Sequence, residues 1–259
     1  MSTPTGSVLD PLAARYVQWL GLPAEATRDT ADEDPALVRA MPVILRIERV
    51  DPPARTPLLE AAAAAAVAVC LDPRAEPDGE WHEPVRAWID GRIRKVSRRA
   101  RGAHWAAVQS LPGVTVTVDG ASVRALVPGL VVEAPKEVTR LQISGSELPP
   151  DEPGPLPDGV PVLWLNPTVE MSAGKLAAQV GHASMLLAAA LRADGQEDFF
   201  ADWKDFRCVV RTPPLRRWAS LHPGDNPLNA WRRRRVVAVR DAGFTEVDPG
   251  TVTVLAQLP

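Results

Sequence analysis

The two halves of this 259-residue sequence share the same order of apolar and helical segments, and this repeat restricts the fold more than any other feature. An apolar, β-branched segment in the first half reads PVILRIERV, and 119 residues later the chain reads PVLWLNPTV. Each is followed by a loop and an Ala- and Leu-rich helical segment, PLLEAAAAAAVAVCL or GKLAAQVGHASMLLAAAL. Self-similarity at a fixed offset indicates a repeated structural unit.

The similarity continues to the end of each half. A strand candidate follows the acidic, Trp-bearing segment, GRIRKVSRR in the first half and FRCVVRT in the second, and then a short helical segment with a Trp. Each half closes with a strand, a turn and a strand, so that Asp119 corresponds to Asp241 and Pro128-Gly129 to Pro249-Gly250. This order predicts an α/β fold of two similar three-layer units, each a mixed four-stranded sheet flanked by helices.

Composition divides the chain around these units. Residues 1–40 are predicted to form an N-terminal helical arm, with helical spacing in its first half, and an acidic loop. The first unit is expected at 41–148 and the second at 160–259. Between them, residues 149–159 read PPDEPGPLPDG, a Pro- and Gly-rich segment typical of a linker.

The charge is unevenly distributed, although the net value is only −3. From residue 160 onward the chain has 12 Lys and Arg against 10 Asp and Glu, which leaves 17 and 22 in the rest. This asymmetry favours the C-terminal unit for an anionic substrate. The N-terminus MSTPTGSVLD lacks the pattern of a signal peptide. The longest apolar run, 58–71, is shorter than the about 20 residues that cross a bilayer.

We therefore expect a cytoplasmic protein. Cys70 and Cys208 lie far apart in apolar segments and lack the spacing of a metal site, so both are expected to be reduced core thiols.

The segment MSAGKLAAQVGHA carries the first candidate site residues. Lys175 falls in the first turn of the predicted helix, where a positive charge opposes the helix dipole. Lys175, Gln179 and His182 are spaced by four and three residues, which places them on one helix face. Taken alone, Lys175 also fits a solvated lysine, and His182 also fits a hydrogen-bonded core residue.

The segment RDAGFTEVDPGTVTV carries the second set. Asp241 ends an apolar strand and precedes a turn, Thr245 lies between two turns, and Thr253 lies in the last strand. Taken alone, Asp241 fits a turn cap and the threonines fit ordinary strand residues.

Together the two segments resemble the second, archaeal and eukaryotic-type, family of peptidyl-tRNA hydrolases. The resemblance covers about 99 residues, from Pro161 to Pro259, with both motifs in the order of the family. It implies hydrolysis of the ester between a peptide, or an N-blocked aminoacyl group, and tRNA in translation, with no metal or other cofactor. The essential lysine of the family falls on Lys175, its essential aspartate on Asp241, and its two threonines on Thr245 and Thr253.

Ester hydrolysis needs an activated water and stabilisation of an oxyanion. Our hypothesis is that Asp241, helped by the hydroxyl of Thr253, orients or partly deprotonates the water. Lys175 and backbone N–H groups at the start of the helix would then stabilise the negative charge that develops.

The sequence departs from the family at several positions near this predicted site. Members usually carry Arg and Asp after the first strand and a second Lys before the helix, where this chain has Asn166, Thr168 and Ala173. They also tend to have Arg after Asp-Ala-Gly, where this chain has Phe244. Fewer cations are therefore expected around the site.

The tRNA is expected to be held mainly through its phosphates, with further contacts from Gln179 and His182. The candidate phosphate ligands lie in two short segments after the second helical pattern: Arg216, Arg217, Arg232, Arg233, Arg234 and Arg235. A second basic stretch, RIRKVSRRAR at 92–101, extends this surface across both units. The alternative to phosphate binding is that these arginines are solvent-exposed residues at the start of a strand and on one face of a helix.

The first unit lacks most of the candidate site residues of the second and is interpreted as a non-catalytic, degenerate copy. On the offset of 119 residues Thr56 replaces Lys175, Glu60 replaces Gln179 and Ala63 replaces His182, while Val132 stands where Thr253 is expected. Because members of the family commonly form homodimers, this copy is predicted to occupy the place of the partner, which gives a monomer with an internal pseudo-dimer. Two alternatives remain: a non-catalytic RNA- or ligand-binding protein on the same fold, and an interaction scaffold.

Overall fold

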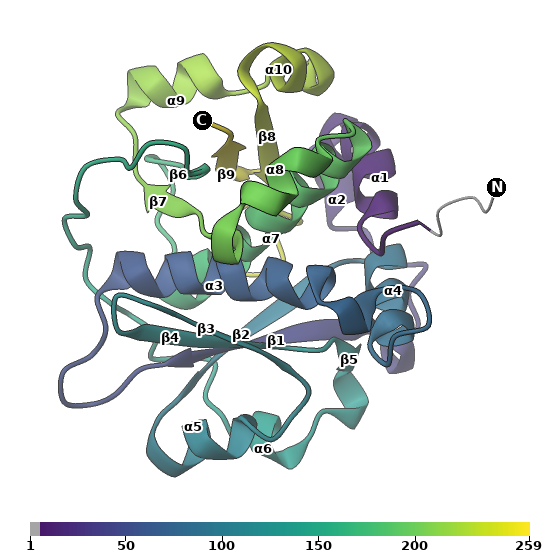
Figure 1. Ribbon diagram of the computed structural model, residues 1–259. Helices are drawn as coiled ribbons and strands as arrows, with labels where there is room; N and C mark the ends of the chain where they lie inside the picture. The colour runs from purple at the N-terminus through teal and green to yellow at the C-terminus, as the bar shows by residue number, and fades with distance from the viewer. Residues whose placement is uncertain (1–5) are drawn as a thin grey trace.

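The computed structural model describes residues 6–259, which form two mixed β-sheets with helices between and around them (Figure 1). The first sheet contains β1 (Arg39–Arg46), β2 (Arg94–Ala100), β3 (Gly113–Val118), β4 (Ala121–Leu126) and the short β5 (Gly129–Leu130). The second contains β6 (Val162–Leu165), β7 (Val209–Arg211), β8 (Val236–Arg240) and β9 (Val252–Gln257).

The two sheets have the same topology. The strand order is β2-β1-β4-β3 in the first sheet and β7-β6-β9-β8 in the second, with β5 added beside β1. In both, the first two strands along the chain are parallel and the other pairs are antiparallel. The predicted α/β class and the two similar units are therefore confirmed.

Helices cover both faces of each sheet. The α-helices of the first unit and the segment before it are α1 (Asp10–Gly21), α2 (Ala24–Thr27), α3 (Arg55–Leu71), α4 (His82–Asp90), α5 (Gly102–Val108) and α6 (Lys136–Thr139). Those of the second unit are α7 (Ala173–Ala193), α8 (Glu197–Asp202), α9 (Leu215–Leu221) and α10 (Pro227–Arg234). Short 3-10 helices occur at Pro35–Leu37, Pro73–Ala75, Val131–Glu133 and Lys204–Phe206.

The helices and sheets stack in layers, from α5 and α6 through the first sheet to α3 and α7, and then through the second sheet to α9 (Figure 1). Within residues 6–259, no helix combines the length and apolar character needed to cross a membrane.

The end of the first unit differs from the prediction. Strands β3 and β4 are joined by a tight turn at Asp119 and Gly120, whose φ angles of 45° and 84° suit a type I′ hairpin. The second strand of this hairpin is therefore ASVRAL, and Pro128-Gly129 follows the hairpin instead of lying inside it. In the second unit the loop from Asp241 to Thr251 joins β8 and β9 and contains Pro249-Gly250.

Because of this difference in turn length, the residue of the first unit that corresponds to Thr253 is also different from the one predicted. Leu45 pairs with Val123 in the first sheet, and Trp164, at the offset of 119, pairs with Leu255 in the second. Two residues earlier on the closing strands, Ala121 and not Val132 occupies the position of Thr253. A constant offset fails here because the first unit makes the same connection with a shorter turn.

The two Ala-rich helices, α3 and α7, pack against each other between the sheets (Figure 1). The run from Ala61 to Ala66 is fully buried, and a Cβ atom built on Gly181 would lie 3.0 Å from the Cβ of Ala66. Since helix separation depends on the side chains at the contact, these small residues let the two backbones approach closely. One continuous apolar core results, and it contains Val123 of the first sheet and Val254 of the second.

Polar contacts also join the units. The buried carboxylate of Glu60 on α3 accepts hydrogen bonds from the backbone N of Val210 (3.0 Å) and from Nη1 of Arg211 (3.2 Å) on β7. Burial raises the pKa of Glu60. The hydroxyl of Ser184 on α7 donates to the carbonyl of Ala63 on α3 at 2.7 Å. Each central helix therefore contacts the other unit through satisfied polar groups as well as through the core.

Helix α1 lies against both units. The hydroxyl of Tyr16 accepts a hydrogen bond from the backbone N of Ala238 on the edge strand β8 at 2.8 Å. The guanidinium of Arg240 donates to carbonyls at the end of α1, including that of Leu20 at 3.0 Å. On the other side, Nη1 of Arg15 donates to the carbonyl at the end of α4 (Asp90, 3.0 Å). This segment, predicted as an arm, therefore bridges the two units.

The packing of α3 on α7 generates a stability prediction. The substitution Ala66→Leu should lower the free energy of unfolding by about 1–3 kcal/mol, because added methylenes in a close-packed core force neighbours apart. Leu and Ala have similar helix propensities, so the change reports packing. Chemical denaturation measures the loss, and Ala193→Leu at the exposed end of α7 serves as the control with an effect within about 0.5 kcal/mol. Equal stabilities of the two variants would contradict the close contact.

The same interface predicts the oligomeric state. Because α3 covers the apolar face of α7 within one chain, we expect a monomer of 27.9 kDa in light scattering coupled to size-exclusion chromatography. A stable mass of twice that value would show that a second copy still pairs with the C-terminal unit.

Candidate active site

The first turn of α7 and the loop after β8 hold the two central residues of the candidate site. Ser172 caps α7, and its hydroxyl accepts a hydrogen bond from the backbone N of Lys175 at 3.1 Å. Asp241 directly follows β8 and exchanges two backbone hydrogen bonds with the end of its loop, to Thr251 at 2.8 Å and from Gly250 at 2.9 Å. The loop is thus closed on itself at Asp241, which fixes the direction of this side chain.

Gly243 allows the loop to close this tightly. It has a φ of +79°, and a Cβ atom placed on it would lie 2.4 Å from the backbone N of Pro249. Its own backbone N donates to Oδ1 of Asp241 at 2.7 Å. No residue larger than glycine fits this position without moving the loop.

A chain of hydrogen bonds joins the predicted catalytic residues. Nζ of Lys175 lies 2.7 Å from Oδ2 of Asp241 and 2.9 Å from Oγ1 of Thr245. The side-chain amide N of Gln179 donates to the same Oδ2 at 2.7 Å, and its carbonyl accepts from the hydroxyl of Thr253 at 2.5 Å. Lys175, Gln179, Asp241, Thr245 and Thr253 therefore form one network.

The two charged groups remain accessible from one side. The side chains of Lys175 and Asp241 are 11% and 9% exposed, and both line a cavity of about 660 Å³. The walls of this cavity come from α1, β2, α7 and β8. Thr245 is exposed beside the pair, whereas Thr253 is fully buried behind Gln179.

The unit that carries this network also matches known proteins. The family model described as Peptidyl-tRNA hydrolase PTH2 matches residues 160–259. A peptidyl-tRNA hydrolase from Methanopyrus kandleri is 37% identical over 97 residues, which cover 36% of this chain and 78% of the relative. The chain belongs to the peptidyl-tRNA hydrolase PTH2 family. No solved structure gives a significant match.

The PTH2 unit shares its cavity with the first unit. His182 lies two turns after Lys175 on the same face of α7, and its Nδ1 is 2.9 Å from Nζ of Lys95 on β2. Nζ of Lys95 is also 5.2 Å from the centre of the buried Trp88 ring. Burial lowers the pKa of Lys95 to about 7. Burial and the charges of Lys95 and Lys175 lower the pKa of His182 well below its ordinary value.

Strand β2 also places a cation beside Phe244, at the position where the PTH2 resemblance leads one to expect Arg. Cζ of Arg94 lies 5.4 Å from the centre of the Phe244 ring. Arg94 and its neighbour Arg92 are paired with Glu33, and Arg92 also with Asp32 at 2.6 Å. These guanidinium groups at the cavity are therefore neutralised by the acidic loop after α2.

The arginines that we predicted to hold tRNA lie elsewhere. Arg216 and Arg217 are on α9, and Arg232 to Arg235 end or follow α10; none of them lines the cavity. Helix α9 covers the face of the second sheet opposite α7 (Figure 1). Arg217 stacks on Trp164 with its Cζ 4.5 Å from the ring centre, and Arg235 pairs with Asp194.

Sequence reasoning did not identify Lys95, Arg94 or the residues of α1 as parts of this cavity. For β2 as part of the site, the basic stretch at 92–101 was the only signal, because the contact of this strand with α7 arises from packing between the units and leaves no spacing pattern. Tyr16 and Trp19 of α1 carry no signal of their own in the sequence.

The described residues contain no group of three or more His, Cys, Asp or Glu side chains placed to hold a metal ion. Cys70 and Cys208 are both buried and free. Burial raises the pKa of Cys70 to about 12 and raises that of Cys208 as well.

The lowered pKa of Lys95 makes stability depend on pH. The ordinary value is 10.5 and the folded value about 7, so between these values the unfolded chain binds the extra proton. The free energy of unfolding should therefore rise with pH across this window, by at most about 1.4 kcal/mol per unit for one proton. In the Lys95→Met variant the free energy of unfolding should rise less between pH 7 and pH 9.5, and chemical denaturation at these two pH values measures the difference. If Lys95→Met and the exposed-site control Lys136→Met keep the parental slope equally, Lys95 is not buried as described.

Proposed function

We propose that the C-terminal unit hydrolyses the ester bond between a peptide, or an N-blocked aminoacyl group, and tRNA, and so releases free tRNA. The observation that carries this proposal is the Lys175–Asp241 pair, 2.7 Å apart at the wall of a cavity of about 660 Å³. Membership of the PTH2 family supports the same reaction class. A place in translation in the cytoplasm follows from this substrate.

Lys175 suits the stabilisation of an oxyanion. An ammonium group has three N–H donors. Two of them are used by Asp241 and Thr245, and the third remains for an oxygen in the cavity. In a low-dielectric site a fixed cation at the developing negative charge lowers the barrier to ester hydrolysis. We assign Lys175 to the carbonyl oxygen of the scissile ester.

Asp241 suits the orientation of the attacking water. A carboxylate has about four acceptor positions. Oδ2 receives Lys175 and Gln179, and Oδ1 receives the backbone N of Gly243, which leaves one acceptor position on Oδ1. A water bound there would lie beside the carbonyl carbon that Lys175 polarises, within reach of the general base.

Gln179 and Thr253 act behind this pair. Because the amide N of Gln179 points at Asp241, its carbonyl oxygen faces Thr253, whose hydroxyl proton is used in that contact. Thr253 is fully buried. We therefore propose a positioning role for Thr253 and Gln179, and we reassign Thr253 from the direct help to the water that the sequence suggested.

The rest of the cavity fits the groups on either side of the ester. Aromatic side chains of Tyr16, Trp19 and Phe244 are among its lining residues, beside Met185 and Leu186. Aromatic faces stack on nucleobases irrespective of their identity. We propose that the terminal nucleoside or the acyl group of the substrate lies here, next to His182.

We also propose that the first unit is non-catalytic. Thr56, at the position of Lys175, donates its hydroxyl to Asp151 at 2.6 Å. Asp119, at the position of Asp241, lies in the hairpin turn with its side chain 71% exposed and 3.8 Å from Arg207. No ion pair comparable to Lys175–Asp241 exists at this place in the first unit as described.

The main alternative is an RNA-binding protein without activity, and an assay with paired variants separates the two. Lys175→Met and Asp241→Asn should each lower kcat/KM for release of an N-blocked aminoacyl group from tRNA by about 100- to 1000-fold. Each single change leaves a buried charge without its partner, which costs stability. The double variant removes both charges, so it should be more stable than either single variant and equally inactive.

Thermal denaturation of all three variants separates loss of fold from loss of chemistry. Lys136→Met, which changes an exposed residue of α6, serves as the charge-matched control and should keep the parental rate. Parental rates in the double variant would exclude this site as the source of the activity. Absence of hydrolysis in the parent, together with tRNA binding, would favour the non-catalytic alternative.

A further inference from the structure

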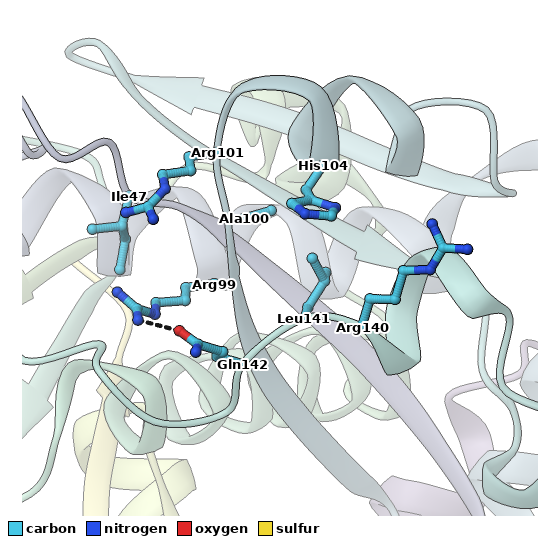
Figure 2. A pocket seen from close by; sticks show the side chains of 8 residues that line it. All are labelled: Ile47, Arg99, Ala100, Arg101, His104, Arg140, Leu141 and Gln142. Atoms are coloured by element: carbon cyan, nitrogen blue, oxygen red, sulfur yellow. Dashed lines mark hydrogen bonds between the residues drawn. The ribbon is translucent and has the colours of Figure 1, made fainter.

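A second cavity, of about 230 Å³, lies on the first unit near the end of β2 (Figure 2). Its lining residues come from the end of β1, from β2 and α5, and from the segment after α6: Ile47, Arg99, Ala100, Arg101, His104, Arg140, Leu141 and Gln142. Figure 2 shows three arginines and a histidine around the opening, with Ala100 and Leu141 between them.

This cavity has a concentrated positive charge. None of its lining residues is acidic. Across residues 6–259, Arg99, Arg101 and Arg140 form no ion pair, in contrast to Arg92 and Arg94 at the start of the same strand. Guanidinium groups without a carboxylate partner keep their donors available for an anion.

Arg99 is held in place for such a contact. Its guanidinium donates to the side-chain oxygen of Gln142, and its backbone N donates to the carbonyl of the same residue at 2.9 Å. The turn at Gly145, with φ +75°, packs against it, since a Cβ atom there would lie 2.8 Å from Cζ of Arg99. An arginine fixed in this way loses less side-chain freedom when it binds a ligand.

The second cavity adjoins the catalytic one. Arg99 and Gln142 line the second cavity, whereas Ser97 and Ile143 line the catalytic cavity. Ser97 and Arg99 are two residues apart on β2, so they share a face of the strand at a separation of about 7 Å. Across residues 6–259, the buried Oγ of Ser97 has no hydrogen-bond partner, which leaves a polar group at the junction of the two cavities.

The junction also touches the first turn of α7. The hydroxyl of Ser146, next to Gly145, accepts a hydrogen bond from the backbone N of Gly174 at 3.1 Å. Lys175 is the next residue. The path from Arg99 to the Lys175–Asp241 pair therefore runs over directly contacting residues.

We propose that this second cavity binds a backbone phosphate of the RNA strand whose 3′ end lies in the catalytic cavity. The inference rests on the proposed function, and it assigns part of the tRNA-binding surface to the non-catalytic unit. Arg99, Arg101 and Arg140 neutralise the phosphate. Contacts of arginine to phosphate carry affinity that is independent of sequence and depends on salt.

Binding of deacylated tRNA, measured at several salt concentrations, tests the proposal whether or not the protein hydrolyses an ester. Arg101→Gln/Arg140→Gln should weaken binding about tenfold, as expected when hydrogen bonds to a charged group are lost. It should also reduce the slope of log K against log salt by about 0.7 to 1, the value of one phosphate contact. Arg28→Gln/Arg86→Gln removes the same charge outside both cavities and should retain the parental slope.

The single variant Arg140→Gln changes an exposed residue, so it keeps the test available if the double variant fails to fold. It should change the binding in the same direction. Parental affinity and slope in a folded Arg140→Gln variant would overturn the proposal. A competition experiment gives a second test. If inorganic phosphate binds in the cavity without weakening the binding of tRNA, the proposal is overturned, because the cavity then binds a free anion and not the RNA.

The outcomes for the two proposals are separable. A parent that binds tRNA through the arginine cavity but releases no N-blocked aminoacyl group contradicts the hydrolase function alone. A parent that hydrolyses the ester while the cavity variants bind tRNA like the parent contradicts the phosphate site alone.

Discussion

The close contact between α3 and α7 is the constraint on which the rest of the molecule depends. Two helices approach this closely only where small side chains face each other, and here Gly181 of α7 meets Ala66 of α3. The same glycine lies beside the aliphatic chain of Lys95, because a Cβ atom there would be 3.2 Å from its Cε. The contact therefore brings β2 of one unit against the helix that carries the catalytic candidates of the other. The shared cavity is a consequence of this packing.

Within the cavity, the hydrogen bonds between side chains restrict the chemical role that each group can have. The carboxylate of Asp241 organises the site, since Lys175, Gln179 and the backbone N of Gly243 all donate to it. Once the amide of Gln179 is fixed by Asp241, its carbonyl oxygen accepts the hydroxyl proton of Thr253 at 2.5 Å, while the carbonyl of Val239 lies farther away at 3.5 Å. This contact is the reason for the proposed positioning role of Thr253, a residue that the family resemblance marks as functional.

The sequence predicted the features that depend on spacing within one unit. Helical spacing placed Lys175 and Gln179 on one face, and the resemblance of the two motifs to the peptidyl-tRNA hydrolase family led us to expect Asp241 beside Lys175. Features that depend on turn length or on packing between units left no such signal. The strand after Asp119 was misassigned because the segment ASVRALVPGLVV offers two apolar stretches, and only the tight turn at Gly120 decides between them. The contact of Lys95 with His182 requires the docking of the two units, which no periodicity reveals.

The charges along β2 bear on how the first unit would contribute to the proposed function. At the start of the strand, Arg92 and Arg94 are neutralised by Asp32 and Glu33. At its end the arginines that line the second cavity form no ion pair within residues 6–259, so the uncompensated positive charge lies at that end. A chain with a net charge of −3 attracts a polyanion only through such local concentrations of charge. Under the two proposals above, the first unit binds the strand and the second performs the chemistry, and this division needs no lysine at the position of Thr56.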